Sequence, residues 1–172
     1  ICSHGSSVGP IEENVYHYVM ARGVEKVDAD KLLIKGFFNE VINNCANRKT
    51  TWINSTIYNL FITLHQMGFA HSVEVSRNKD LVGGLYGLTL GSVFFAESMY
   101  STSPNGSKIA LIALMGILAL HKFSLLDVQF MTNHLRNMGA KEISRALFLN
   151  LIKKSSSEKV QFDKPSSAII DE

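Results

Sequence analysis

The chain has 172 residues, of which 46% are hydrophobic and 19% charged, and its formal net charge is +2. This length and composition are typical of one compact soluble domain. The small positive charge argues against a protein that grips long nucleic acid by charge alone, because such domains carry a strong basic excess. A contact with one end of an RNA remains compatible with it.

Cysteine usage and hydropathy exclude further classes. The two cysteines, Cys2 and Cys45, have no C-x-x-C spacing, so neither a zinc site nor a disulfide framework is predicted, and a reducing, cytoplasmic location is favoured. The longest apolar run, Ile109–Leu120, is shorter than the roughly 20 residues that a bilayer span needs. It predicts a buried helix and no membrane association. The N-terminus shows no signal-peptide pattern.

The first part of the chain is predicted to be helical. Residues 11–21 are expected to form a short helix and residues 28–47 a longer one. The next helix is capped by Asn54 or Ser55 and ends near Gly68. Its apolar face is expected to hold Ile57, Leu60, Phe61 and Leu64.

An antiparallel meander is predicted to follow. Residues 70–76 alternate as a strand, residues 77–80 form a turn, and a second strand starts at Leu81. Gly91 marks the turn into a third strand over residues 92–99.

The remainder is expected to mix helices and short strands. The expected elements are an apolar helix from Asn105 to His121, a strand over 124–130, a helical turn over 134–138, an edge strand at 142–143 and a last helix over 145–152. We therefore predict an α+β fold, in which helices flank a mixed, largely antiparallel sheet. The predicted segments are 1–27 at the N-terminus, a main domain over 28–154 and a polar, disordered tail over 155–172.

Glu97 is the single charged residue between Leu81 and Ser101. In a strand over 92–99 it would share a face with Val93, Phe95 and Met99. Burying an unpaired carboxylate is costly, so the group needs a partner or a function. Two interpretations stay open at this point: a salt bridge at the sheet edge, or a carboxylate in an apolar pocket that binds an amine or has a shifted pKa.

Asp127 and Gln129 form a second candidate. Two residues apart in a strand, they would lie on the same face, where a carboxylate beside an amide can accept a proton and orient a reacting group. The alternative is that Asp127 caps the strand end. Trp52, the only tryptophan, either packs in the core or stacks on a base.

Several common chemistries are not supported. His65, His71 and His134 have no metal-ligand spacing and are expected in the core or on the surface. Gly83-Gly84 lacks the Lys-Ser/Thr of a phosphate loop, and no Gly-x-Ser-x-Gly elbow is present. We therefore predict no metal site and no serine nucleophile.

Several short sequence words occur in a specific order between about Phe37 and Leu151. They are Thr51-Trp52-Ile53, Leu64-His65, Gly68 to Val75, Leu81 to Gly87, Phe95 with Glu97-Ser98-Met99, Ser107-Lys108, Leu126-Asp127 with Gln129, His134-Leu135, Gly139-Ala140 and Glu142-Ile143. This pattern resembles the leucyl/phenylalanyl-tRNA–protein transferases, whereas residues 1–27 are not expected to match that family. The resemblance implies a fold similar to the Gcn5-type acetyltransferases, without coenzyme A or another cofactor.

The implied activity is transfer of Leu or Phe, and also Met, from aminoacyl-tRNA to the N-terminal α-amine of proteins that begin with Arg or Lys, which marks them for degradation. The implied partners are the 3′ end of the tRNA and these acceptor proteins, with no metal and no membrane.

The resemblance also implies roles for individual residues. Asp127 would orient or deprotonate the attacking amine with help from Gln129, and Glu97 would hold a cationic amine or orient the ester. Trp52 would stack on the terminal adenosine of the tRNA. The donor side chain would lie among Leu85, Met99, Leu111 and Leu126.

Three alternatives remain at the level of the sequence. One is a related transferase with an Arg donor or an acidic acceptor, although the pocket reads as apolar. Another is a non-catalytic binding remnant. A coenzyme A acetyltransferase is the weakest alternative, because Ser103-Pro104-Asn105-Gly106 does not match a pyrophosphate-binding loop.

Overall fold

The computed structural model describes residues 38–77 and 80–162. Its centre is a four-stranded sheet in the order β1-β2-β3-β4. The first three strands, β1 (Ala70–Arg77), β2 (Asp80–Leu90) and β3 (Val93–Ser101), form an antiparallel meander, and β4 (Leu125–Asp127) pairs parallel to β3. The predicted mixed, largely antiparallel sheet and the predicted meander are both confirmed.

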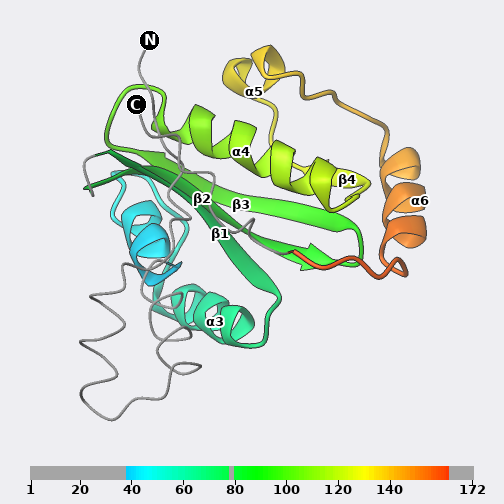
Figure 1. Cartoon of the computed structure of the whole chain (residues 1–172), viewed down its shortest axis with the longest axis horizontal. Helices are drawn as coiled ribbons and strands as arrows, with labels where there is room; N and C mark the ends of the chain where they lie inside the picture. The colour runs from blue at the N-terminus through cyan, green and yellow to red at the C-terminus, as the bar shows by residue number, and fades with distance from the viewer. Residues whose placement is uncertain (1–37, 78–79, 163–172) are drawn as a thin grey trace.

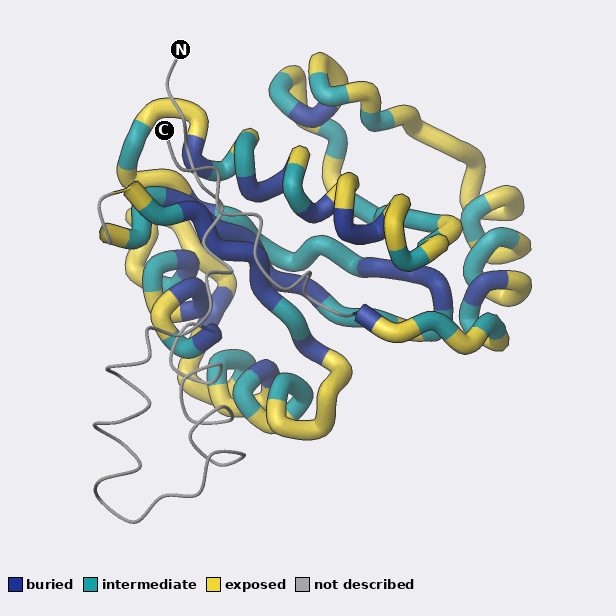
Figure 2. Tube along the Cα trace, in the orientation of Figure 1, coloured by how far each residue is buried: buried dark blue, intermediate teal, exposed yellow. Residues whose placement is uncertain are grey.

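Helices cover both faces of the sheet (Figure 1). The α4 helix (Gly106–Leu120) lies along one face, and α3 (Ser55–Gln66) lies with a helical segment over residues 38–46 on the other. Each layer encloses its own apolar cluster. Figure 2 shows the most buried residues along the central strands and the inner side of α4. No helix within the described residues is long and apolar enough to cross a bilayer.

Helix starts follow the expected capping chemistry in most cases. Asn54 accepts a hydrogen bond of 2.9 Å from the backbone N–H of Ile57, as predicted for α3. Asn105 precedes α4, as expected, but it adopts a left-handed conformation and its side chain makes no capping bond. The predicted apolar face of α3 is wrong at Leu60, which is 54% exposed.

Two strand predictions near the end of the chain are wrong. The expected strand over 124–130 is limited to Leu125–Asp127, because Gln129 has a left-handed φ of 61° that turns the chain away from β3. Residues 142–143 form no strand within the described structure. The chain instead passes from α5 (Asn133–Asn137) through an irregular stretch into α6 (Arg145–Ser155).

The predicted face of β3 is also wrong, because Glu97 is a bulge residue. Tyr86 pairs with Ser98 and the adjacent Gly87 pairs with Ala96, so Glu97 has no partner on β2. The extra residue places Met99 on the α4 side together with Ala96, which strict alternation would not allow. A Cβ at Gly87 would clash with the Phe95 carbonyl, so glycine permits the close approach opposite the bulge.

Beyond α6 the chain returns to the sheet (Figure 1). Phe162 is buried there, and its ring centroid lies 5.4 Å from that of Phe94 and 4.5 Å from that of His71. The described part of the predicted tail therefore contributes to the core. The predicted helix over 11–21 and the first part of the predicted helix over 28–47 lie outside the described residues. The division into segments 1–27, 28–154 and 155–172 stays a prediction.

Candidate functional site

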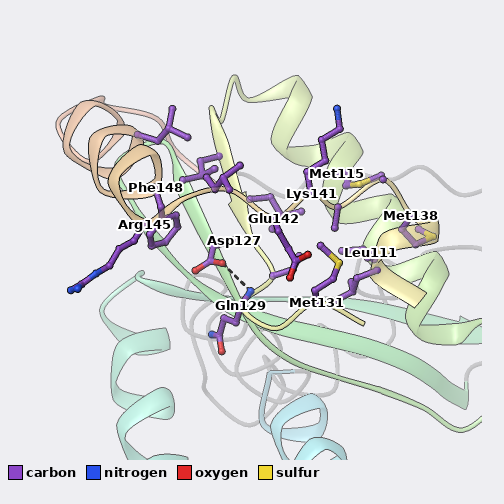
Figure 3. Close-up of a pocket in the computed structure, with 18 residues that line it drawn as sticks. Leu111, Met115, Asp127, Gln129, Met131, Met138, Lys141, Glu142, Arg145 and Phe148 are labelled. Carbon is purple, nitrogen blue, oxygen red and sulfur yellow. Dashed lines mark hydrogen bonds between the residues drawn. The ribbon is translucent and has the colours of Figure 1, made fainter. Parts of the chain in front are cut away.

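Glu97, Asp127 and Gln129 meet beside the end of β4. The backbone N–H of Gln129 donates to Asp127 Oδ1 at 2.9 Å, and its side-chain Nε2 donates to Glu97 Oε2 at 3.1 Å. Gln129 therefore bridges the two carboxylates, and Figure 3 shows its bond to Asp127. The sequence placed Asp127 and Gln129 together by strand alternation, but a turn brings them together instead.

The local fold explains why these groups converge. Asp127 is the last residue of β4 and pairs with Phe95 on β3. Glu97 follows Phe95 by two residues and occupies the bulge, beyond the reach of β4. Because the chain leaves the sheet at residue 128, the Gln129 side chain reaches the bulge where a fourth-strand residue would otherwise lie. A short strand and a bulge together create the site.

The surroundings of Glu97 shift its acidity. Burial raises the pKa of the Glu97 carboxyl, the hydrogen bond from Gln129 opposes that rise, and the nearby Asp127 charge adds to it. The local charge therefore favours a cation at this site. A carboxyl with a raised pKa beside a specific partner is a common feature of functional sites.

A cleft of about 820 Å³ opens next to this group. Asp127 and Gln129 lie on its wall with apolar residues from α4, β4, α5 and α6. Figure 3 shows Lys141 and Arg145 extending away from Asp127. The apolar residues that line the cleft include Leu111, Met115, Leu126, Met131, Met138 and Phe148.

The four residues of the predicted donor pocket all belong to the apolar cluster under α4. Leu85 and Leu111 are buried, and Met99 and Leu126 pack against the cluster with partial exposure. Leu111 and Leu126 also line the cleft, whereas Leu85 and Met99 are not among its lining residues. The pocket residues therefore lie together, but only two of them face the cleft.

Trp52 lies on the opposite layer of the molecule. Its side chain is 48% exposed and meets Phe61 edge-on, with ring centroids 6.4 Å apart. Phe61 in turn packs on Tyr86 of β2 at 4.9 Å. Trp52 is thus supported from behind and keeps exposed aromatic surface, but it makes no direct bond to the three polar residues within the described structure.

Sequence reasoning missed Arg48, which it counted only as part of a polar break. The Arg48 side chain hydrogen-bonds Ser98 and Met99, residues that follow Glu97 on β3. These partners are 50 and 51 residues away along the chain, so no local pattern could signal the contact.

The histidines and acidic residues do not suggest a metal centre. His65 Nδ1 lies 2.7 Å from the carbonyl of Ala70, and His71 Nε2 lies 3.1 Å from Thr89 Oγ1. Within residues 38–77 and 80–162, no group of three or more His, Cys, Asp or Glu side chains is arranged to hold a metal ion.

Comparison with known proteins identifies the family. A family model described as leucyl/phenylalanyl-tRNA protein transferase matches residues 13–153. A relative of that name from Dinoroseobacter shibae is 51% identical over 108 residues, covering 63% of this chain and 48% of the relative. One from Cereibacter sphaeroides is 42% identical over 137 residues, covering 80% and 64%. The chain belongs to the leucyl/phenylalanyl-tRNA–protein transferase family, which confirms the resemblance.

The chain spans about half to two thirds of the length of the curated relatives it matches. Among solved structures, an aminoglycoside acetyltransferase from an uncultured soil metagenomic sample, in complex with sisomicin, is similar with a TM-score of 0.47 and 12% identity. That alignment covers 64% of this chain and 85% of the other. At this level the likeness says nothing about what the present chain binds or does.

Proposed function

We propose that this chain transfers Leu or Phe, and also Met, from the 3′ end of aminoacyl-tRNA to the N-terminal α-amine of proteins that begin with Arg or Lys. The transfer would take place in the cytoplasm and would mark the acceptor for degradation. The observation that carries the proposal is the hydrogen-bonded series Glu97–Gln129–Asp127 beside an apolar pocket, in a member of this family.

The chemistry requires neither a covalent nucleophile nor a metal. The donor is an activated ester, so the neutral α-amine of the acceptor attacks the ester carbonyl directly. A C–N bond forms, the ester C–O bond breaks, and the ribose hydroxyl leaves with a proton. The protein must hold the two reactants together and move one proton from the amine.

Asp127 is proposed as the group that accepts this proton, with Gln129 as the relay. Gln129 already contacts Asp127 through its backbone and Glu97 through its side chain. An amine that binds beside Gln129 would therefore lie between two carboxylates. Positioned proton transfer of this kind contributes roughly 10²–10⁴-fold to a rate.

Glu97 is proposed to hold a cationic amine, as distinct from the neutral amine that attacks, or to orient the ester. Its raised pKa reflects desolvation, which strengthens its interaction with a bound cation. The bulge directs Glu97 out of the regular pairing of β3 while Met99 faces α4. The charged and apolar parts of an aminoacyl group would thus find adjacent partners.

The apolar residues and Trp52 would bind the rest of the donor. A pocket made of Leu85, Met99, Leu111 and Leu126 distinguishes similar side chains by only about 1–3 kcal/mol per methylene, so Leu, Phe and Met are all reasonable donors. The exposed aromatic surface of Trp52 would stack on the terminal adenosine, which is worth roughly 1–3 kcal/mol.

The experiment incubates the purified chain with radiolabelled leucyl-tRNA and a model protein that begins with Arg, and it measures label in the protein. The matched control is the same protein with its N-terminal α-amine acetylated, which should receive no label because the nucleophile is blocked. Replacing Trp52 by alanine should weaken leucyl-tRNA binding by roughly 5- to 150-fold, the equivalent of the stacking energy.

A negative result has a defined continuation. If the folded chain transfers no label from leucyl-tRNA, the assay is repeated with Phe-, Met- and Arg-tRNA and with acceptors that begin with Asp or Glu. Transfer of Arg, or transfer to acidic acceptors, would replace the proposed specificity. Failure of all of these donors and acceptors would contradict the transferase proposal and favour a non-catalytic binding module.

A further inference from the structure

The Arg48 side chain joins two segments that carry different parts of the proposed site. Its Nε donates to the Cys45 carbonyl at 3.0 Å, its Nη1 to the Met99 carbonyl at 3.0 Å and its Nη2 to Ser98 Oγ at 2.6 Å. One guanidinium therefore links the end of the helical segment over 38–46 to β3 at the residues that follow Glu97.

The position of this link on β3 is significant. β4 pairs with β3 only from Val93 to Phe95, so it does not support the strand at Glu97 or beyond. The bulge itself interrupts the pairing with β2 at Glu97. Arg48 bonds to the strand immediately after this interruption, where a planar group with several fixed donors restrains both a side chain and the backbone.

The same residue restrains the segment that carries Trp52. Arg48 lies at one end of the short connection over 48–54, and Asn54 is fixed at the other end as the cap of α3. Between them, the Ile53 backbone N–H donates to Thr51 Oγ1 at 3.2 Å, and the Ile53 side chain is buried. Trp52 is therefore carried on a short connection anchored at both ends, and one anchor is attached to β3.

We propose that Arg48 is a positioning residue that fixes the location of Trp52 relative to Glu97. The inference rests on the proposed function, in which these two residues bind the adenosine and the aminoacyl group of one donor molecule. Without the Arg48 link, the connection that carries Trp52 would still pack on α3 and β2 through Phe61 and Tyr86, but it would no longer be bonded to β3 beside Glu97. A displacement of about 1 Å at a reacting centre can reduce a rate roughly 100-fold.

A competing explanation is that Arg48 simply attracts the phosphates of the tRNA. Three variants separate the two ideas. Arg48→Lys keeps the charge but lacks the forked donors, Arg48→Met removes both, and Lys49→Met removes the neighbouring, exposed charge, whose side chain has no assigned role. If Arg48 acts only by attracting phosphates, tRNA binding should be retained in Arg48→Lys and weakened in both Met variants, because phosphate binding depends on charge. That weakening should also depend on the salt concentration.

The first measurement uses no substrate. Trp52 is the only tryptophan of the chain, so its fluorescence reports directly on the connection that carries it. We expect acrylamide to quench Trp52 more strongly in Arg48→Lys and in Arg48→Met than in the wild-type chain. Lys49→Met should behave like wild type.

The second measurement is transfer kinetics with leucyl-tRNA. Both Arg48 variants should lose roughly tenfold or more in kcat/KM, with a higher KM for the donor and a lower kcat, because both ends of the donor are affected. Lys49→Met should stay within about twofold of wild type. Wild-type quenching and transfer in Arg48→Lys, or losses that follow charge alone, would overturn the proposal.

Two controls keep the test decisive. If Arg48→Lys does not fold, Ser98→Ala removes a single partner of the guanidinium and should change quenching and kcat/KM in the same direction by less. Unchanged quenching and kinetics in a folded Ser98→Ala would then overturn the proposal. If wild type transfers nothing, the proposed function fails, whereas the quenching comparison still decides whether Arg48 holds Trp52.

Discussion

The two ends of β4 carry polar clusters of opposite character. At its start, Ser92, Ser124, Ser155 and Glu158 form a closed group in which each side chain bonds to another member. At its end, Glu97, Asp127 and Gln129 form an open group that borders a cleft. Only the 3 residues of β4 separate the two clusters along this strand, so a large separation does not explain their different character.

The closed cluster holds elements together. Ser124 Oγ lies 2.5 Å from Ser92 Oγ and donates to Ser155 Oγ at 2.7 Å, while Ser92 Oγ also donates to Glu158. The Ser92 backbone N–H donates to the Ser155 carbonyl at 2.9 Å. Ser92 and Ser155 are buried. These bonds attach the end of α6 to the turn between β2 and β3.

The open cluster is arranged differently, since a single residue, Gln129, bridges two carboxyl groups. Buried polar groups that serve the fold are normally satisfied by one another. A partly desolvated carboxyl beside a second carboxylate is unfavourable for the fold, and such compromises concentrate at functional sites. The comparison predicts that one cluster can be changed with little loss of stability and the other with little loss of activity.

The largest expected effect is that of Asp127→Asn on activity. The amide oxygen can still accept from the Gln129 backbone N–H, so the turn should persist, but the proton acceptor is lost. The single-turnover transfer rate should fall roughly 10²–10⁴-fold with an unchanged melting temperature. A folded variant that transfers at the wild-type rate would remove Asp127 from the mechanism.

Ser92→Ala should have the opposite effect. It removes the hydroxyl that donates to Glu158, while Ser124 keeps its bond to Ser155 Oγ, and loss of a hydrogen bond to a charged group costs about 1.5–3 kcal/mol of unfolding free energy. Urea unfolding measures this loss, and transfer per folded molecule should not change. Ser157→Ala is the matched control, because its hydroxyl donates to the Lys154 carbonyl at an exposed position. A loss of transfer without a loss of stability would show that the closed cluster serves the reaction.

Glu97→Gln should separate stability from activity in a pH-dependent way. Burial raises the pKa of Glu97, so the folded protein binds this proton more tightly than the unfolded chain. The stability associated with Glu97 is therefore fully present below the ordinary glutamate range and is lost as the pH rises through the raised pKa. A neutral glutamine avoids that loss.

We expect Glu97→Gln to increase the free energy of unfolding at neutral pH and to have little effect below the ordinary glutamate range. Transfer should fall at the same time, because the cation site is lost. Urea unfolding at both pH values, with transfer rates, measures this. If Glu97→Gln instead increased the free energy of unfolding only in acid, the pH dependence would be the opposite of the expected one. That result would show that the Glu97 carboxylate is stabilised in the folded protein.

The sequence predicted the regular helices and strands of the fold better than the site. Alternation and turn residues located the meander, and Asn54 was one of the two residues predicted to cap α3. The bulge at Glu97 was missed, because a hydrophobic pattern cannot show an extra residue that only the neighbouring strand reveals. The end of β4 was missed because Gln129, not a glycine, adopts the left-handed conformation.

The candidate residues were found individually, but their arrangement was not. Glu97 and Asp127 were singled out because carboxylates are unusual in apolar stretches, and the bridge through Gln129 depends on a tertiary contact between β3 and the segment after β4. Arg48 gave no local signal, because two of its three partners lie on a distant strand. Irregular backbone and long-range bonds thus make the site, and neither is encoded in a local pattern.

The smallest effect is expected beside the open cluster, at the apolar residues. Met99 packs under α4 next to the bulge, while Met115 lines the cleft from α4. If the donor side chain lies with Met99, Met99→Ala should enlarge its pocket and shift the preference between Leu and Phe by about tenfold toward the larger donor. Met115→Ala, the matched control, should leave the ratio unchanged. Competition between leucyl- and phenylalanyl-tRNA measures both. A shift in Met115→Ala alone would place the donor in the cleft with Leu111 and Leu126, and it would make Met99 a core residue.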